Sequence, residues 1–117
     1  MLYRPSKYGS RKITTATGDT FDSVKEYSRW CELRLEERAG VIADLRRQVK
    51  YELIPRQKLD GKVVEQAVTY IADFVYSKNG KTVVEDVKGY KKGQAYAVFV
   101  LKRKLMLHVH GIRVKEV

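Results

Sequence analysis

The sequence predicts a mixed α/β (α+β) fold, with a central mixed β-sheet flanked by helices and the element order α-β-β-β-α-β. Three observations predict it. Two segments place apolar residues at helical spacing, four shorter segments alternate in polarity or are continuously apolar, and Asn79-Gly80 separates two of the shorter ones. An Asn-Gly pair between two β-rich runs is the strongest short-range signal for a β-hairpin. A chain of 117 residues has room for one such domain and not for a second core.

The composition is that of a basic globular protein. Lys and Arg number 24 against 14 Asp and Glu, so the formal net charge is +10 at pH 7, and 44% of the residues are hydrophobic. These values exclude disordered and collagen-like chains, whereas the excess positive charge favours a polyanionic partner such as nucleic acid. A lone Cys31, no apolar run long enough to span a membrane and no signal peptide together predict a soluble, cytoplasmic protein.

Residues 1–20 are expected to form a basic N-terminal arm, ahead of a single domain at 21–117. Basic residues and tyrosines alternate along the arm, namely Tyr3, Arg4, Lys7, Tyr8, Arg11 and Lys12. Basic side chains neutralise phosphates and aromatic rings stack on bases, so Arg11 and Lys12 are candidate nucleic-acid contacts. The alternative is a solvated terminus without a ligand.

The first helix is predicted for residues 22–40. One apolar stripe at helical spacing consists of Val24, Tyr27, Cys31 and Leu35. Gly40 is a natural helix stop, and Cys31 is interpreted as a buried structural thiol because it lies on the stripe. Ser23 and Glu26 have the spacing of a capping box, in which each side chain satisfies a backbone N–H at the helix start.

Three strands and a second helix follow. Residues 48–54 alternate and end before a proline, and a polar connection is expected through Gly61. Residues 69–76 and 82–88 form the predicted hairpin. The stretch 94–108 is predicted as a helix, although part of it could pass for a strand. Helical spacing is kept by Val98, Leu101, Leu105 and Val109, and Gly111 ends the helix. Residues 112–117 alternate and are predicted as a last short strand.

The hairpin turn allows the register to be worked out. If Asn79 and Gly80 are the central residues of a type I′ turn, Asp73 faces Asp86 across the two strands. Directly opposed Cβ atoms lie about 4.5–5.5 Å apart, where two carboxylates repel each other. Lys88 would project from the same face one pair further along, opposite Ile71. Glu85 belongs to the other face, so the register prefers Asp86 over Glu85 as the partner of Asp73.

Paired carboxylates on rigid strands are what an oxygen-seeking divalent ion such as Mg2+ requires. A nearby lysine, here Lys88, can orient a water molecule or stabilise charge on a phosphate. The structural alternative is a salt bridge from Lys88 to one aspartate, with the other aspartate solvated at a sheet edge. A one-residue slip of the turn would also put Asp73 and Asp86 out of step.

Asp73 on one strand and Asp86-Val87-Lys88 on the next resemble the PD-(D/E)xK nuclease superfamily, with Ala72 in place of the usual proline. The chain is similar to small phage-encoded nucleases and, more distantly, to endonuclease I-type Holliday-junction resolvases. The wider pattern that carries the resemblance covers residues 21–117 and includes Phe21-Asp22-Ser23-x-x-Glu26, Gln48, Tyr70-Ile71-Ala72-Asp73-Phe74, Val84-Glu85-Asp86-Val87-Lys88-Gly89 and Leu101-Lys102-Arg103-Lys104-Leu105.

The resemblance implies a restriction-endonuclease-like core and a metal-dependent DNA endonuclease that hydrolyses phosphodiester bonds, foremost a phage resolvase of Holliday junctions or branched DNA, located in the host cytoplasm. It implies Mg2+, for which Mn2+ can substitute, held by Asp73, Asp86 and Glu26, with Lys88 as the fourth catalytic residue. Cutting two strands symmetrically needs two sites, so a homodimer is expected, with no membrane and no small-molecule cofactor.

Further basic residues are expected to hold the DNA backbone. Lys102 lies at the edge of the predicted apolar arc of the second helix and could reach the hairpin, whereas Arg103 and Lys104 point further out. Lys91 and Lys92 follow the Asp-x-Lys motif in a candidate phosphate-holding loop. Two other functions stay open: a nicking or repair endonuclease of the same fold, and a non-enzymatic basic nucleic-acid-binding module.

Overall fold

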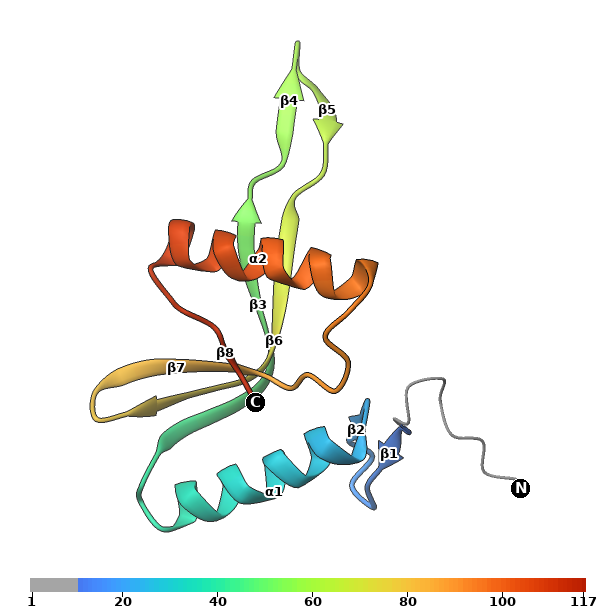
Figure 1. Cartoon of the computed structure of the whole chain (residues 1–117). Coiled ribbons are helices and arrows are strands. Elements are labelled where there is room, and N and C mark those ends of the chain that lie inside the picture. Colours follow the sequence, from blue (N-terminus) through green and yellow to red (C-terminus); the bar gives the residue numbers. More distant parts are fainter. Residues whose placement is uncertain (1–10) are drawn as a thin grey trace.

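The computed structural model describes residues 11–117 (Figure 1). The predictions on Tyr3, Arg4, Lys7 and Tyr8 lie outside this range. Along the chain, the elements are β1 (Ile13–Thr14), β2 (Thr20–Phe21), α1 (Val24–Arg38), β3 (Ala43–Ile54), β4 (Gln57–Leu59), β5 (Lys62–Glu65), β6 (Val68–Lys78), β7 (Lys81–Asp86), α2 (Gln94–His110) and β8 (Lys115–Glu116). The predicted order is therefore present, and two short hairpins, β1–β2 and β4–β5, are added to it.

The central sheet is mixed, as predicted. Its strand order is β3-β6-β7-β8, where β3, β6 and β7 pair antiparallel and β8 joins parallel to β7. Figure 1 shows α2 lying across β3 and β6, while α1 lies at the end of the molecule away from the β4–β5 hairpin. No helix among residues 11–117 is both long enough and apolar enough to cross a membrane.

The predicted register of the β6–β7 hairpin is confirmed. Asn79 and Gly80 both have positive φ, at 52° and 76°, as a type I′ turn requires, and the pairing starts with Lys78 opposite Lys81. It continues as far as Phe74 opposite Glu85. The strand β7 ends one residue later, at Asp86, which pairs with Glu116 of β8.

The position predicted for Lys88, in a strand pair with Ile71, is wrong. Lys88 lies two residues beyond the end of β7, because the chain leaves the hairpin after Asp86. The backbone there turns to β8: the Lys88 N–H donates to the Val117 carbonyl, and the Val117 N–H donates to the Asp86 carbonyl. On the side of β7 that faces β6, the Val87 N–H donates to Oδ2 of Asp73, a side-chain oxygen, so the β6–β7 ladder does not continue.

The sheet turns over near its centre, in the sense that the helix covering one of its faces changes there. Tyr70 and Ala72 belong to the apolar cluster that contains Phe99 and Met106 of α2. Phe74 and Tyr76, which continue the same alternation along β6, belong instead to the cluster that contains Leu33 of α1. Side chains two residues apart on a strand share a face. Along β6, one face of the twisted sheet is therefore covered by α2 before Asp73 and by α1 after it.

Gln48 marks this point on the neighbouring strand. It lies between Arg47, which pairs with Phe74, and Val49, which pairs with Ala72, so it is opposite Asp73. Its φ is 52°, in the left-handed region that a residue with a side chain rarely adopts inside a strand. Such a conformation costs about 1–3 kcal/mol and persists only where the surrounding structure enforces it.

Both helices are present, but the faces predicted to be buried are wrong. In α1 the buried side chains are Glu26 and Leu33, whereas Leu35 of the predicted stripe is 63% exposed and Cys31 is only partly buried. In α2 the buried residues are Phe99 and Met106; of the predicted stripe, Val98, Leu101 and Val109 are exposed and Leu105 packs against the core. Each helix has apolar side chains on two faces, and the sheet covers the face that contains Leu33 in α1 and Phe99 and Met106 in α2.

The segment expected to be a polar connection is a β-hairpin. Asp60 and Gly61 have φ of 50° and 77°, as in a type I′ turn, and β4 pairs antiparallel with β5. Figure 1 shows this hairpin projecting beyond the rest of the molecule, and every residue of its two strands is exposed. The Asp-Gly pair was a hairpin signal of the same kind as Asn79-Gly80.

Candidate active site

One pocket of about 400 Å³ gathers all four residues predicted to be catalytic, Glu26, Asp73, Asp86 and Lys88. It lies where the sheet turns over, between the start of α1, the centre of β6, the end of β7 and the middle of α2. Its lining consists of Asp22, Ser23, Glu26, Gln48, Thr69, Tyr70, Ile71, Asp73, Asp86, Val87, Lys88 and Lys102. Residues separated by up to 80 positions in the sequence thus share one space.

Asp73 is fixed by its neighbours and is electrostatically strained. Its Oδ2 accepts a hydrogen bond from the Val87 N–H at 2.8 Å, and its Oδ1 lies 3.4 Å from Nε2 of Gln48. Burial, and then the negative charge of Asp86, raise the pKa of Asp73 to about 7, against the lowering effect of the Val87 N–H. A carboxylate held in this way would be stabilised by a nearby cation.

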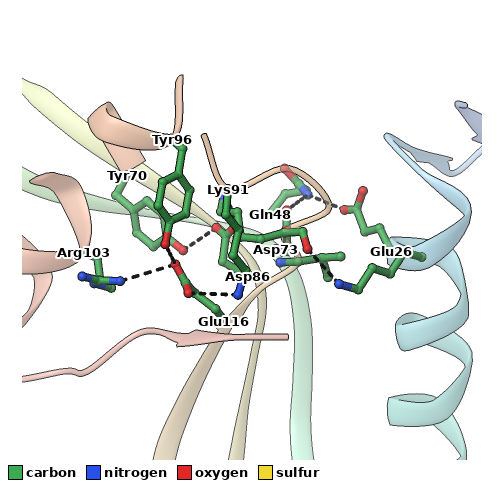
Figure 2. Close-up of polar contacts among 12 residues, drawn as sticks. Glu26, Gln48, Tyr70, Asp73, Asp86, Lys91, Tyr96, Arg103 and Glu116 are labelled. Carbon is green, nitrogen blue, oxygen red and sulfur yellow. Dashed lines mark hydrogen bonds and ion pairs between the residues drawn. The ribbon is translucent and has the colours of Figure 1, made fainter. Parts of the chain in front are cut away.

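Asp86 is buried and paired at both oxygens. The Tyr70 hydroxyl donates to Oδ2 at 2.6 Å, and Nζ of Lys88 lies 2.7 Å from Oδ1 (Figure 2 shows the Tyr70 contact). The Lys88 ammonium also sits 3.9 Å from the centre of the Phe99 ring, a cation–π contact with α2. The salt bridge of the structural alternative is therefore present, but Asp73, which that alternative left in solvent, is partly buried in the same pocket.

Glu26 is at once a helix cap and a member of the site. Its own N–H donates to Oγ of Ser23 at 3.0 Å, and its Oε2 accepts from the Asp22 N–H at 2.8 Å, which together form a capping arrangement. Its Oε1 accepts from Nε2 of Gln48 at 3.3 Å. Burial, opposed by the Asp22 N–H, raises the pKa of Glu26. The two roles inferred for Glu26 use different oxygens of one carboxylate.

Gln48 joins Glu26 to Asp73 through its amide nitrogen (Figure 2). Gln48 is part of the motif pattern in the sequence, but no role was predicted for it. Its strained backbone and its two carboxylate contacts occur at the same residue, so the amide positions both acids.

Tyr70 was also missed as a partner of Asp86. A buried tyrosine hydroxyl needs a hydrogen-bond partner, and that requirement is the signal that could have found it.

The donor set suits a hard divalent cation. Asp73 and Asp86 offer carboxylate oxygens, which Mg2+ prefers; burial and then repulsion by Asp86 raise the pKa of Asp73, and a bound cation would offset both effects. Among residues 11–117, no three His, Cys, Asp or Glu side chains are close enough together to hold an ion by themselves. Glu26 is connected to the aspartates through Gln48 and not by direct contact.

The family of proteins of unknown function DUF1064 matches residues 5–115. The chain belongs to this family. No curated protein and no solved structure matches the chain. What this DUF1064 protein does must therefore be argued from its own site.

Of the basic residues of this DUF1064 chain that were predicted to contact the DNA backbone, only Lys102 lines the pocket. Arg103 and Lys91 both face Glu116, at 3.4 and 3.5 Å, and Glu116 also accepts from the Tyr96 hydroxyl at 2.8 Å (Figure 2). The remaining candidates, Lys92, Lys104, Arg11 and Lys12, are exposed and do not line the pocket. The basic residues thus divide into one that lines the site, two beside Glu116 and four exposed ones outside the site.

Glu85 lies on the other face of the sheet, as the register predicted. Arg29 of α1 donates two hydrogen bonds of 2.7 Å to its carboxylate, and the Tyr76 hydroxyl donates a third. Burial would raise the pKa of Glu85, but these partners hold it below its ordinary value. Glu85 is fully buried and does not line the pocket, so its role in the DUF1064 fold is to fasten α1 to the sheet.

Proposed function

We propose that this protein is a metal-dependent DNA endonuclease that hydrolyses phosphodiester bonds. The observation that carries the proposal is the convergence of Glu26, Asp73, Asp86 and Lys88 in one pocket, with Lys102 at its edge. All four are residues that the sequence motif predicts to be catalytic. Perturbed carboxylates inside a cleft are typical of functional sites, and the raised pKa of Asp73 fits that pattern.

The topology supports a restriction-endonuclease-like core of the PD-(D/E)xK superfamily. One aspartate lies near the middle of β6, and the Asp-x-Lys motif lies where β7 ends, on a mixed sheet with a helix before it and a helix after it. The β6–β7 hairpin places the two aspartates directly after its last pair, Phe74 with Glu85, and both line the pocket. This arrangement supports the finer fold class, which we propose together with the activity.

In the proposed mechanism, Asp73 and Asp86 hold Mg2+, with Mn2+ able to substitute, and Glu26 serves the same site. When bound, the ion supplies Lewis-acid activation of water and offsets the charge of the phosphate. Lys88 has three N–H donors, so it can stay on Oδ1 of Asp86 and still donate to a phosphate oxygen. Gln48 holds Glu26 and Asp73 in place, and Tyr70 fixes Oδ2 of Asp86.

The DNA class that we propose is branched DNA, with the enzyme acting as a phage Holliday-junction resolvase. Resolving a junction requires two cuts in strands of the same polarity, and one chain supplies one site. The working enzyme is therefore proposed to be a homodimer. A nicking or repair endonuclease of the same fold would use the same residues and would need only one site.

A non-enzymatic nucleic-acid-binding module is the second candidate. It is favoured by the internal partners of the aspartates: Asp86 is already paired by Tyr70 and Lys88, and Asp73 accepts from the Val87 N–H. If those contacts were the only purpose of the two acids, the basic surface would bind DNA and nothing would be cut.

Incubation with labelled branched, duplex and single-stranded DNA, in Mg2+ or in EDTA, tests these functions. We expect cleavage only with the metal, strongest on the branched substrate. Asp73→Asn and Asp86→Asn should abolish cleavage and keep DNA binding. Asp60→Asn, at the exposed turn of the β4–β5 hairpin, is the matched control and should cut like the wild type. Binding without cleavage on every substrate would select the binding module, and cleavage by Asp73→Asn would refute the assigned site.

A further inference from the structure

A second groove, of about 500 Å³, runs along the side of α2 opposite to the candidate active site. Its lining is Arg103, Lys104, Leu107, Arg113, Val114, Lys115 and Glu116, from α2 and the C-terminal segment that contains β8. Helix α2 is the shared wall of the two hollows, because Lys102 lines the active site and the next residue, Arg103, lines the groove.

The groove begins next to the active site. Asp86 of the site and Glu116 of the groove are direct partners in the parallel pairing of β7 with β8. Neighbouring strands lie roughly 4.8 Å apart, so only one strand spacing separates the two residues. Figure 2 shows Glu116 below Asp86, with Arg103 and Lys91 directed toward it. The active site and the groove are therefore neighbours across the β7–β8 pairing.

The charge of the groove is strongly positive. It has four cationic side chains and a single carboxylate, Glu116, which already accepts from Tyr96 and faces Lys91 as well as Arg103. Lys104 and Arg113 are exposed, and within residues 11–117 neither forms an ion pair. Cations without a counterion at the edge of a hollow are the electrostatic requirement for binding phosphates.

The floor of the groove is apolar. Val114 is buried beneath it, and Leu107 forms one wall with about half of its surface exposed. Cationic edges above an apolar floor fit the alternation of a nucleic-acid backbone, in which charged phosphates are joined by less polar sugars. An acidic peptide would satisfy the edges and would leave the apolar wall without a matched partner.

We propose that this groove binds the sugar–phosphate backbone of a DNA strand as it continues from the active site, with Lys104 and Arg113 each contacting a phosphate. The inference rests on the proposed function, because the site supplies the strand that the groove would hold. It adds the C-terminal segment, which no motif had indicated, to the DNA-binding surface.

The test is the salt dependence of DNA binding, measured by fluorescence anisotropy of a labelled duplex in EDTA, where no cleavage occurs. Each phosphate contact contributes about 0.9 to the slope of log K against log [salt]. Lys104→Gln/Arg113→Gln should lower the slope by about 1.8 and weaken binding about 60-fold at 0.1 M salt, because 0.1 raised to the power −1.8 is about 60. The matched control is Lys58→Gln/Lys62→Gln in the exposed β4–β5 hairpin, which removes the same charge and should leave the slope unchanged.

The outcomes separate the groove from the enzyme activity. If the wild type cleaves DNA but the groove variant keeps the wild-type slope, the groove is overturned and the function stands. If the wild type never cleaves but the groove variant loses the slope while its circular dichroism stays native, the groove stands and the function is overturned. If the groove variant keeps the wild-type salt slope for DNA but loses affinity for a labelled polyglutamate peptide, the groove binds an acidic protein segment and the proposal is overturned.

Discussion

Without a bound metal ion, the negative charge of Asp73 in the candidate active site should destabilise the folded protein. Asp73→Asn removes the charge that Asp86 and burial oppose, and it keeps an oxygen that can accept from the Val87 N–H. We expect the variant to be more stable than the wild type in EDTA at pH 8, although it has lost its proposed catalytic function. A residue that served only the fold would show the opposite.

The magnitude follows from the pKa of Asp73, which the fold raises from 3.8 to about 7. One pKa unit corresponds to 1.36 kcal/mol, so full ionisation costs the folded state at most about 4 kcal/mol. Because Asp73 is only partly buried, solvent screening reduces this, and we expect a gain of about 2 kcal/mol in the variant. For a domain near this size, that raises the melting temperature by about 10 °C.

The sign of the pH dependence is fixed by the direction of the shift. Between pH 3.8 and about 7 the folded wild type binds more protons at Asp73 than the unfolded chain does. Its free energy of unfolding therefore falls, relative to that of the variant, as the pH rises through this window. Wild type and variant should melt together near pH 4 and should be furthest apart above pH 7.

Thermal unfolding followed by circular dichroism at pH 4, 5.5 and 8, first in EDTA and then with Mg2+, measures both effects. Added Mg2+ should stabilise the wild type at pH 8 by binding only the folded state, and it should have little effect on Asp73→Asn. Asp60→Asn, at an exposed turn, should show neither effect. A melting-temperature difference that is independent of pH, or a variant that is less stable at pH 8, would refute the electrostatic account of the site.

Three further predictions concern other parts of the molecule. Arg29→Met should lower the free energy of unfolding by about 3–5 kcal/mol, because it leaves the buried Glu85 carboxylate unpaired; Arg29→Met/Glu85→Leu should recover most of the loss in the same urea titration. Tyr70→Phe should cost about 1.5–3 kcal/mol and slow cleavage, since Asp86 loses a charge-assisted hydrogen bond; an unchanged rate would show that Tyr70 does not position Asp86. Replacing residues 56–65 by an Asn-Gly turn should change the melting temperature by only a few degrees, and a large drop would show that the β4–β5 hairpin contributes to the core.

How much could be predicted from the sequence depended on how local the determinant was. The β6–β7 register was predicted residue by residue, because two turn residues, Asn79 and Gly80, set it within the hairpin itself. The capping arrangement at Ser23 and Glu26 was predicted for the same reason. These contacts depend on neighbours a few positions away, and no knowledge of the packing was needed.

The buried helix faces depended on long-range packing and were predicted wrongly. In α2, Leu101 and Phe99 lie on different faces, and both faces look apolar in the sequence. The choice between them is made by the sheet, where Phe99 packs near Tyr70 and receives the Lys88 ammonium on its ring. In α1 the buried face contains Glu26, which no apolar pattern would select, since burial of an acid depends on partners from other strands.

The position of the site follows from the turning-over of the sheet. If two helices cover opposite faces of a sheet, their side chains cannot reach the same pocket, because the sheet lies between them. At Gln48 and Asp73 the helix that covers this face of the sheet changes from α2 to α1, so Glu26 of α1 and Lys102 of α2 line the same pocket. The left-handed backbone of Gln48 and the ionised Asp73 are both costly, and both occur at this point. A sheet selected only for stability would avoid both, so their coincidence is the strongest physical reason to look for catalysis there.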